Sequence, residues 1–253
     1  MMIHNPLPHQ IPDLKQLWKL AFGDTDVFID AFFENGFAPD RCLCIPDETY
    51  GIAAALYWFD CSLEDRKTAY IYGVATHPAR QGKGLCRRLM ETARSHLSEL
   101  GFSSILLVPQ KEDLRGMYRK LGYRDCTCVS EFFCTDDPYS TPMHIIDVQE
   151  YAQLRRQHLP EGSVIQEGDN LRFLASYARF YKGMDFIMAA YTEDDSLFAM
   201  EYLGNRGSAA GILCSLGLSQ GTFRTPGDKL PFAMFLALQE DAPEPGYFGF
   251  AFD

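Results

Sequence analysis

The segment AYIYGVATHPARQGKGLC, residues 69–86, decides the fold of this chain. Its first half is rich in aromatic and β-branched residues, which is typical of a strand. Its second half is a loop that contains Gly82 and Gly84. Leucines at helical spacing follow, so residues 84–100 are predicted to form an amphipathic helix that ends before Gly101. The segment therefore predicts a strand, a glycine loop and a helix in direct succession.

Such a junction is suited to binding a diphosphate. The first amides of a helix have no acceptor within the helix, and the helix dipole places partial positive charge there. Glycine allows close approach of the backbone, and Arg80 and Lys83 add charge. A plain strand-to-helix turn remains the alternative. The third glycine of the dinucleotide-binding pattern is replaced by Arg87, and Gly84 stands where a Walker loop has Ser or Thr.

The flanking sequence predicts an α/β chain in two parts. Residues 136–142 are polar and contain two prolines, so they are the expected boundary between domains 1–135 and 136–253. The order strand, helix, strand around residues 68–122 predicts a parallel crossover. Further helices are expected at 12–22, after 24, at 111–121, 148–158, 170–180 and 208–216. Strands are expected at 41–45, 50–62, 68–76, 103–108, 123–134, 143–147, 185–191 and 197–203, with apolar segments at 230–238 and 247–252.

The loop resembles the signature of the GNAT superfamily of N-acetyltransferases, Gln/Arg-x-x-Gly-x-Gly/Ala. The signature reads QGKGLC at residues 81–86, where Cys86 stands in place of the usual Gly or Ala. Residues 105–109 look like the fifth strand of the family, which splays from the fourth. Residues 118–123, YRKLGY, are similar to the family ending Tyr-x-Lys-x-Gly-Phe/Tyr. The close match covers residues 68–123.

The resemblance implies a mixed, partly parallel twisted sheet flanked by helices, followed by a second, smaller, degenerate GNAT-like domain that completes the acceptor cleft. It implies transfer of an acetyl group from acetyl-CoA to a primary amine by direct attack in a ternary complex. Tyr118 matches the residue that protonates the CoA thiolate; a packing role, or only a hydrogen bond to the sulfur, is the alternative. The expected acetyl-CoA-binding residues are Val74, Ala75, Thr76, Arg80, Gln81, Gly82, Lys83, Gly84, Leu85, Cys86, Val108 and Tyr118.

The general base is not apparent near the loop. Many family members use a glutamate on the fourth strand, but residues 68–76 contain no carboxylate. The base therefore lies elsewhere, with His77, Glu131 and Asp253 as the candidates, or bulk water suffices. The apolar ending YFGFAFD, residues 247–253, looks like that of multidomain acetyltransferases of the enhanced-intracellular-survival type, whose terminal carboxylate reaches the active site. We therefore expect Asp253 to act as base or amine anchor; a strand that only completes the second sheet is the alternative.

Composition limits the classes of partner. The net charge is −11, with 15 basic and 17 acidic residues in 1–135 against 8 and 17 in 136–253. Such acidity disfavours nucleic acid; it suits a cationic acceptor or simply solubility. The eight cysteines form no Cys-x-x-Cys pair, so free thiols in a cytoplasmic protein are expected, with no metal.

No segment has the length or character of a membrane span or signal peptide, so no membrane partner is expected. Two other functions stay open at this point. One is a non-catalytic acyl-CoA-binding sensor on the same fold. The other is an acyltransferase whose acceptor is a protein or peptide amine.

Overall fold

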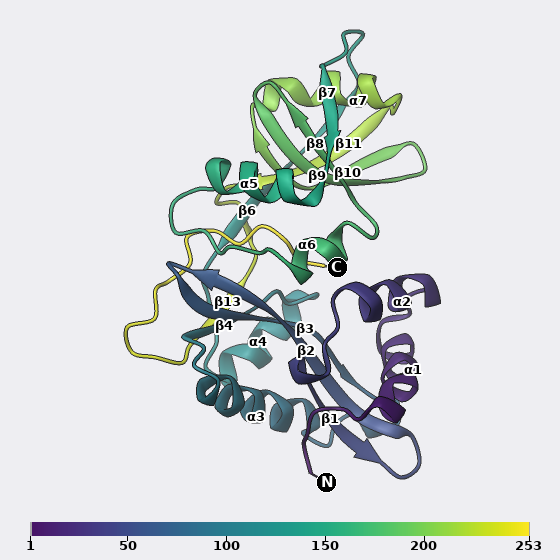
Figure 1. The fold of residues 1–253 in the computed structure, drawn as a ribbon, viewed down its shortest axis with the longest axis vertical. Helices are drawn as coiled ribbons and strands as arrows, with labels where there is room; N and C mark the ends of the chain where they lie inside the picture. The colour runs from purple at the N-terminus through teal and green to yellow at the C-terminus, as the bar shows by residue number, and fades with distance from the viewer. Residues whose placement is uncertain (1, 253) are drawn as a thin grey trace. The chain divides into compact units, whose positions relative to one another are not determined.

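The computed structural model describes residues 2–252, which form two compact units with one sheet each (Figure 1). Unit 1 comprises residues 1–124 and 234–243, and unit 2 comprises residues 125–233 and 244–253. Both sheets are mixed and flanked by helices, so the chain has the α/β architecture that the sequence predicts. No helix within residues 2–252 combines the length and apolar character that crossing a membrane requires.

The sheet of unit 1 has the order β1-β2-β3-β4-β13-β5. Strands β1 to β3 are antiparallel to one another, whereas β3 and β4 are parallel and are joined by a helix. The strands are β1 (Cys42–Asp47), β2 (Gly51–Leu63), β3 (Arg66–Thr76), β4 (Ser104–Leu107), β13 (Met234–Ala237) and β5 (Arg124–Asp125). The helices are η1 (Pro8–Gln10), α1 (Ile11–Phe22), α2 (Asp26–Asn35), η2 (Pro39–Arg41), η3 (Pro78–Arg80), α3 (Leu85–Glu99) and α4 (Glu112–Lys120).

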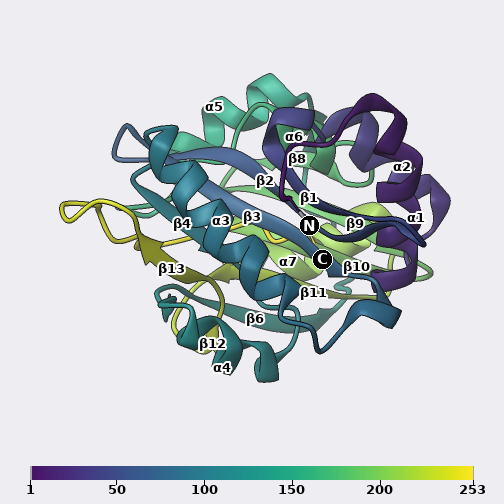
Figure 2. The same cartoon turned by 90° about the horizontal axis from the view of Figure 1, so that it is seen from below.

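Helices cover both faces of this sheet. Successive strand residues point to opposite faces, and Tyr57 of β2 contacts Trp18 of α1 while the adjacent Trp58 contacts His96 of α3. Helix α3 therefore lies on the face opposite α1, and Figure 2 shows it crossing the strands. Its buried stripe is Leu85, Leu89, Met90, Ala93 and Leu97, whereas the spacing of apolar residues predicted Leu100 in place of Met90; Leu100 is exposed.

Unit 2 repeats the same order of elements: three antiparallel strands, a helix and a parallel strand. Its sheet has the order β12-β6-β11-β10-β9-β8-β7, and β10 and β11 are parallel. The strands are β6 (Cys128–Thr135), β7 (Met143–Ile146), β8 (Arg179–Gly183), β9 (Phe186–Glu193), β10 (Ser196–Gly204), β11 (Gln220–Pro226) and β12 (Leu230–Pro231). The helices are α5 (Val148–His158), α6 (Asp169–Leu174), η4 (Arg206–Ser208) and α7 (Ala209–Leu216).

Two strands pair in a sheet that their position along the chain does not suggest, and the sequence did not predict this. Strand β13 comes from late in the chain, yet it pairs with β4 of unit 1. Strand β6 follows unit 1 directly, yet it pairs with β11 of unit 2. The expected strand at 123–134 is therefore divided between two sheets, and the units separate at 124/125 instead of 135/136. Alternating hydrophobicity identifies a strand and its buried face but not its neighbour in a sheet.

Two other predicted segments differ from the structure, and one strand was not predicted. Residues 170–180 form the short helix α6 and then enter β8, and β11 was missed altogether. Residues 247–252 are buried but form no regular strand; Tyr247 makes a single bridge to Ser163. The glycine, proline and polar residues of β11 (QGTFRTP) are typical of a loop, and pairing on both sides overrides that preference.

Candidate functional site

Strands β3 and β4 run parallel only over their first residues. Their pairing extends from Thr68 and Ser104 to Ile71 and Leu107, whereas β3 continues to Thr76. Within residues 2–252, the end of β3 makes no further ladder with β4, so its backbone groups on that side are open to another extended chain. Val74, Ala75 and Thr76 lie on this free length, and Val108 lies just beyond the end of β4. Pairing thus stops in the region where the fourth and fifth strands were expected to splay.

The loop after β3 leaves the start of α3 without a cap. Gly82 and Gly84 both adopt left-handed backbone angles, with φ of +73° and +72°, and a Cβ at either position would meet nothing within 4 Å. Glycine is therefore required by the backbone conformation and not by crowding. No side chain caps α3 and its first turn holds no acid, whereas Thr25 caps α2 and Asp147 caps α5. The first amides of α3 are thus available to an anion.

Arg80 is anchored to the neighbouring turn. Its Nε and Nη2 donate hydrogen bonds to the Asp47 carboxylate at 2.7 and 3.1 Å. Its guanidinium also lies over the Tyr50 ring, 4.9 Å from the centroid, and the His77 ring stacks on the same tyrosine. Asp47 is buried and also accepts the amide hydrogen bonds of Thr49 and Tyr50. Asp47 was missed from the sequence because it is 33 residues from Arg80 and lies in an ordinary turn.

The ion pair between Arg80 and Asp47 persists over a defined pH range. The hydrogen bonds from Arg80, more than any other contact, lower the pKa of Asp47 to about 2. A carboxylate with a lowered pKa contributes its stabilisation above its unfolded pKa of about 3.9 and loses it as the pH falls through the folded value. The loop should therefore stay fastened across the neutral range and be released only between about pH 4 and pH 2.

The substitution Asp47→Asn is expected to raise the KM for acetyl-CoA about fivefold with little change in kcat, because a loosened loop no longer positions the first amides of α3. Steady-state kinetics from pH 6 to 9 measure this effect, which should not vary with pH over that range. Asp26→Asn, which removes an exposed pair with Lys19, is the matched control. An unchanged KM in the Asp47 variant would show that the anchor has no part in binding.

Tyr118 lies on the last turn of α4 and is 7% exposed. Burial raises its pKa, and the nearby Cys86 thiol raises it further, so the phenol stays protonated at neutral pH. Tyr118 and Leu85 belong to one core cluster, and Val74 and Cys86 pack against it. The structure thus brings together predicted residues from β3, α3 and α4, whereas Gln81, Lys83 and both glycines of the loop are exposed.

Of the three candidates for the base, the structure describes His77 and Glu131. His77 caps η3 by accepting the amide hydrogen bond of Ala79, and its ring stacks on Tyr50. Glu131 lies on β6 in the sheet of unit 2, where it pairs with Arg224 at 2.9 Å. Asp253 lies outside the described residues.

The free edge of β3 and the uncapped start of α3 give unit 1 a surface suited to an extended chain that ends in phosphates. Residues 3–126 match the sequence model of the acetyltransferase (GNAT) domain. Residues 3–126 therefore carry a GNAT acetyltransferase domain, and the protein is an acyltransferase.

Solved structures match nearly the whole chain. A probable N-acyltransferase from Enterococcus faecalis has a TM-score of 0.70 at 13% identity, over 94% of this chain and 72% of that chain. A GCN5-related N-acetyltransferase from Kribbella flavida has a TM-score of 0.70 at 15% identity, over 95% and 73%. A tandem GNAT protein from the clavulanic acid biosynthesis pathway has a TM-score of 0.58 at 12% identity, over 95% and 100%. At these identities the likeness shows the fold alone. No curated protein matches the chain.

Proposed function

We propose that this protein transfers an acetyl group from acetyl-CoA to a primary amine by direct attack in a ternary complex. The observation that carries the proposal is that Val74 of β3 and Cys86 of α3 pack against the core cluster that contains Tyr118 of α4, and that the Cys86 thiol is near enough to Tyr118 to raise its pKa. The free edge of β3 suits the amides of a pantetheine arm. The uncapped start of α3, with Lys83 beside it, suits the phosphates.

The proposed reaction needs one proton donor and one proton acceptor. The amine nitrogen attacks the thioester carbonyl carbon, a C–N bond forms and the C–S bond breaks. The Tyr118 hydroxyl gives its proton to the departing thiolate, and the proton lost by the amine goes to a base or to water. Burial keeps Tyr118 protonated, so the donor is present throughout the range in which amines become nucleophilic.

Asp253 is our proposal for the residue that accepts the proton or anchors the amine. The described tail, up to Phe252, is buried and held by hydrogen bonds within unit 2. Unit 2 carries most of the net negative charge, which would favour a cationic acceptor.

We further propose that unit 2 is a degenerate GNAT-like domain without an acetyl-CoA site of its own. The strand β10 and helix α7 are arranged like β3 and α3, but the chain covers the start of α7 with its own residues. Thr141 donates its amide to Gly211 O at 2.9 Å, and a Cβ at Gly211 would lie 2.9 Å from Tyr139 O. Ser215 Oγ donates to Thr141 O at 2.7 Å. These contacts hold residues 139–141 against α7, which supports the proposal.

The decisive assay measures free CoA released from acetyl-CoA with a panel of amines. Tyr118→Phe is expected to lower kcat about 100-fold while CoA affinity is kept, because only the donated proton is removed. Tyr139→Phe, at an exposed tyrosine of unit 2, is the control. A chain extended by two residues after Asp253 should also lose activity if the terminal carboxylate takes part.

The outcomes separate the alternatives. Wild-type protein that binds acetyl-CoA but releases no CoA with any amine would be a sensor and not an enzyme. An active Tyr118→Phe variant with unchanged kcat would remove the tyrosine from the reaction. Activity with peptides alone would change the acceptor class and leave the chemistry as proposed.

A further inference from the structure

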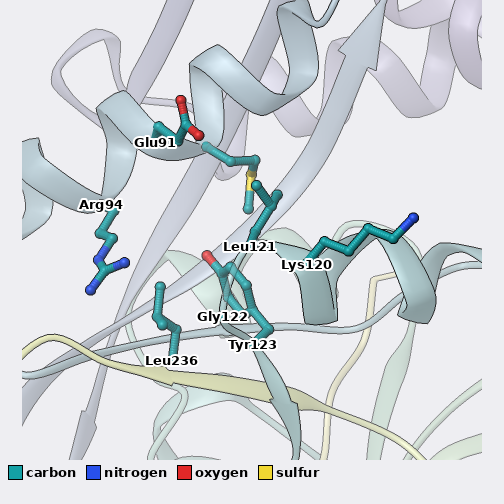
Figure 3. Close-up of a pocket in the computed structure, with 8 residues that line it drawn as sticks. Glu91, Arg94, Lys120, Leu121, Gly122, Tyr123 and Leu236 are labelled. Carbon is teal, nitrogen blue, oxygen red and sulfur yellow. The ribbon is translucent and has the colours of Figure 1, made fainter.

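Unit 1 contains a pocket of about 320 Å³ away from the glycine loop. Its roof is the middle of α3, its end wall is the C-terminus of α4, and its floor includes β13 (Figure 3). The lining residues are Met90, Glu91, Arg94, Lys120, Leu121, Gly122, Tyr123 and Leu236. None of the residues expected to bind acetyl-CoA is among them, so the pocket is a separate site. The pocket lies where α4 ends at Lys120, beside the middle of α3.

The Tyr123 hydroxyl is the first indication that the pocket takes a ligand. Tyr123 is 3% exposed, and its hydroxyl has no hydrogen-bond partner in the described part of the chain. Buried hydroxyls in folded proteins are nearly always paired, and Figure 3 shows this one directed toward α3 across the pocket. Burial raises the pKa of Tyr123. The hydroxyl therefore stays protonated and presents a donor.

The charges around the pocket are the second indication. Arg94 and Lys120 are exposed, and neither forms an ion pair or hydrogen bond with another described residue. The one carboxylate of the lining, Glu91, is paired with Arg87 at 2.8 Å. The pocket therefore has two free cations and a buried phenol donor, a combination that binds an anion.

The rest of the lining is apolar. Met90, Leu236 and the Tyr123 ring belong to the core cluster of unit 1, and Leu121 packs against it. The apolar body of an organic anion can cover what remains exposed of these side chains, which an inorganic anion cannot do. The volume lies at the lower end of the range usual for ligand pockets, which suits a compact ligand.

We propose that this pocket binds a small organic carboxylate. The Arg94 guanidinium and the Lys120 ammonium contact the carboxylate, and the Tyr123 hydroxyl donates a hydrogen bond to it. The apolar body of the ligand rests on Met90, Leu121 and Leu236. The proposal is independent of the acetyl-transfer mechanism because it uses residues that the reaction does not.

Benzoate is a suitable probe, and calorimetric titration of the full chain measures its affinity. We expect a dissociation constant of about 1 mM, as is usual for so small a ligand. Benzamide, which has the same shape without the charge, and inorganic phosphate, which has charge without an apolar body, should each bind at least about tenfold more weakly. Arg94→Gln should weaken benzoate binding about tenfold or more, and Arg88→Gln, the same change at an exposed position of α3 outside the pocket, should not.

Tyr123→Phe completes the test because it removes only the hydroxyl. This variant should fold with an unchanged or higher Tm, because the hydroxyl has no partner in the free protein, and should bind benzoate about three- to tenfold more weakly. Saturating CoA should leave benzoate binding unchanged. Displacement of benzoate by CoA, equal affinity in the Arg94 variant, or no saturable binding up to about 10 mM would each overturn the proposal.

Discussion

A fragment comprising residues 1–135 alone is expected not to fold, although it contains every motif of the acetyltransferase domain. The fragment lacks β13, which pairs with β4 through four residues and lies between β4 and β5. Met234, Phe235 and Leu236 of this strand are 0%, 1% and 7% exposed. Burying three such side chains contributes about 5–9 kcal/mol, which is comparable to the whole stability of a typical domain.

The matched control contains β13, which is joined to the end of the fragment by a new linker. The two chain crossings lie side by side, because Cys126 donates its amide to Ala233 O at 3.1 Å and Phe232 donates its amide to Thr127 O at 2.8 Å. A short Gly-rich linker can therefore join residue 125 to residue 234. We expect this chain, residues 1–125 followed by 234–243, to fold and bind CoA.

Tryptophan fluorescence and circular dichroism measure the difference. Both tryptophans, Trp18 and Trp58, are buried in unit 1, so fluorescence reports this unit alone. The 1–135 fragment should show neither a blue-shifted emission nor a cooperative melt, and the reconnected chain should show both. A cooperative melt of the 1–135 fragment would mean that β13 is dispensable.

Glu201→Leu is expected to reduce the stability of unit 2 by about 3–5 kcal/mol. Arg155 and Glu201 are 1% and 0% exposed and are joined by two hydrogen bonds, Nε to Oε2 at 2.6 Å and Nη2 to Oε1 at 2.9 Å. The hydroxyls of Tyr151 and Tyr247 donate to the same carboxylate at 3.0 and 3.2 Å. The substitution removes the acceptor of three side chains and leaves a buried guanidinium without a counter-charge.

The Glu201 carboxylate is tightly packed against the backbone of the tail. A Cβ at Gly249 would lie 1.8 Å from Glu201 Oε1 and 2.9 Å from Arg155 Nη2. Arg155 also lies over the Phe250 ring, 4.4 Å from its centroid. The ion pair therefore fastens the tail of the chain as well as joining α5 to β10.

Two variants isolate the cause of the loss. The double variant Arg155→Met with Glu201→Leu should recover most of the stability, because no buried charge is left unpaired. Glu150→Gln, in the exposed pair with Lys182, should change the stability by less than about 0.5 kcal/mol. Hydrogen exchange of the Phe250 amide, which donates to Gln166 Oε1, reports the tail directly. Unchanged exchange in Glu201→Leu would show that the tail is held without the ion pair.

The parts of the site that the sequence predicted are local in the chain. The two loop glycines, the helix after them and Tyr118 lie within fifty residues, and their spacing alone places them on a strand, a loop and two helices. Asp47 could not be found in this way, because its contact with Arg80 depends on how β1 packs beside the loop. The Tyr123 pocket could not be predicted for the same reason, because β13, which is distant in the sequence, forms part of its floor.

For the tail, too, the local sequence pattern predicted burial but not the distant residues that the tail contacts. Its aromatic composition correctly predicted burial of residues 247–252. Its partners are a buried carboxylate on β10 and the Gln166 side chain, which bonds both backbone groups of Phe250 in place of a neighbouring strand. Periodicity carries no information about such side-chain partners.

The late position of β13 in the chain also determines when the sheet of unit 1 can be completed during synthesis. The partner of Leu107 in the sheet is Met234, so the ribosome must add 127 residues after Leu107 before the pair is complete. At about 5–20 residues per second, the ribosome needs roughly 6–25 s to make this stretch. During that interval the β4 edge has emerged without its neighbour, and an unpaired apolar edge is a template for wrong pairing. Translation rate and chaperone supply should therefore govern the yield of active protein more strongly than they do for a domain whose strands follow one another in order.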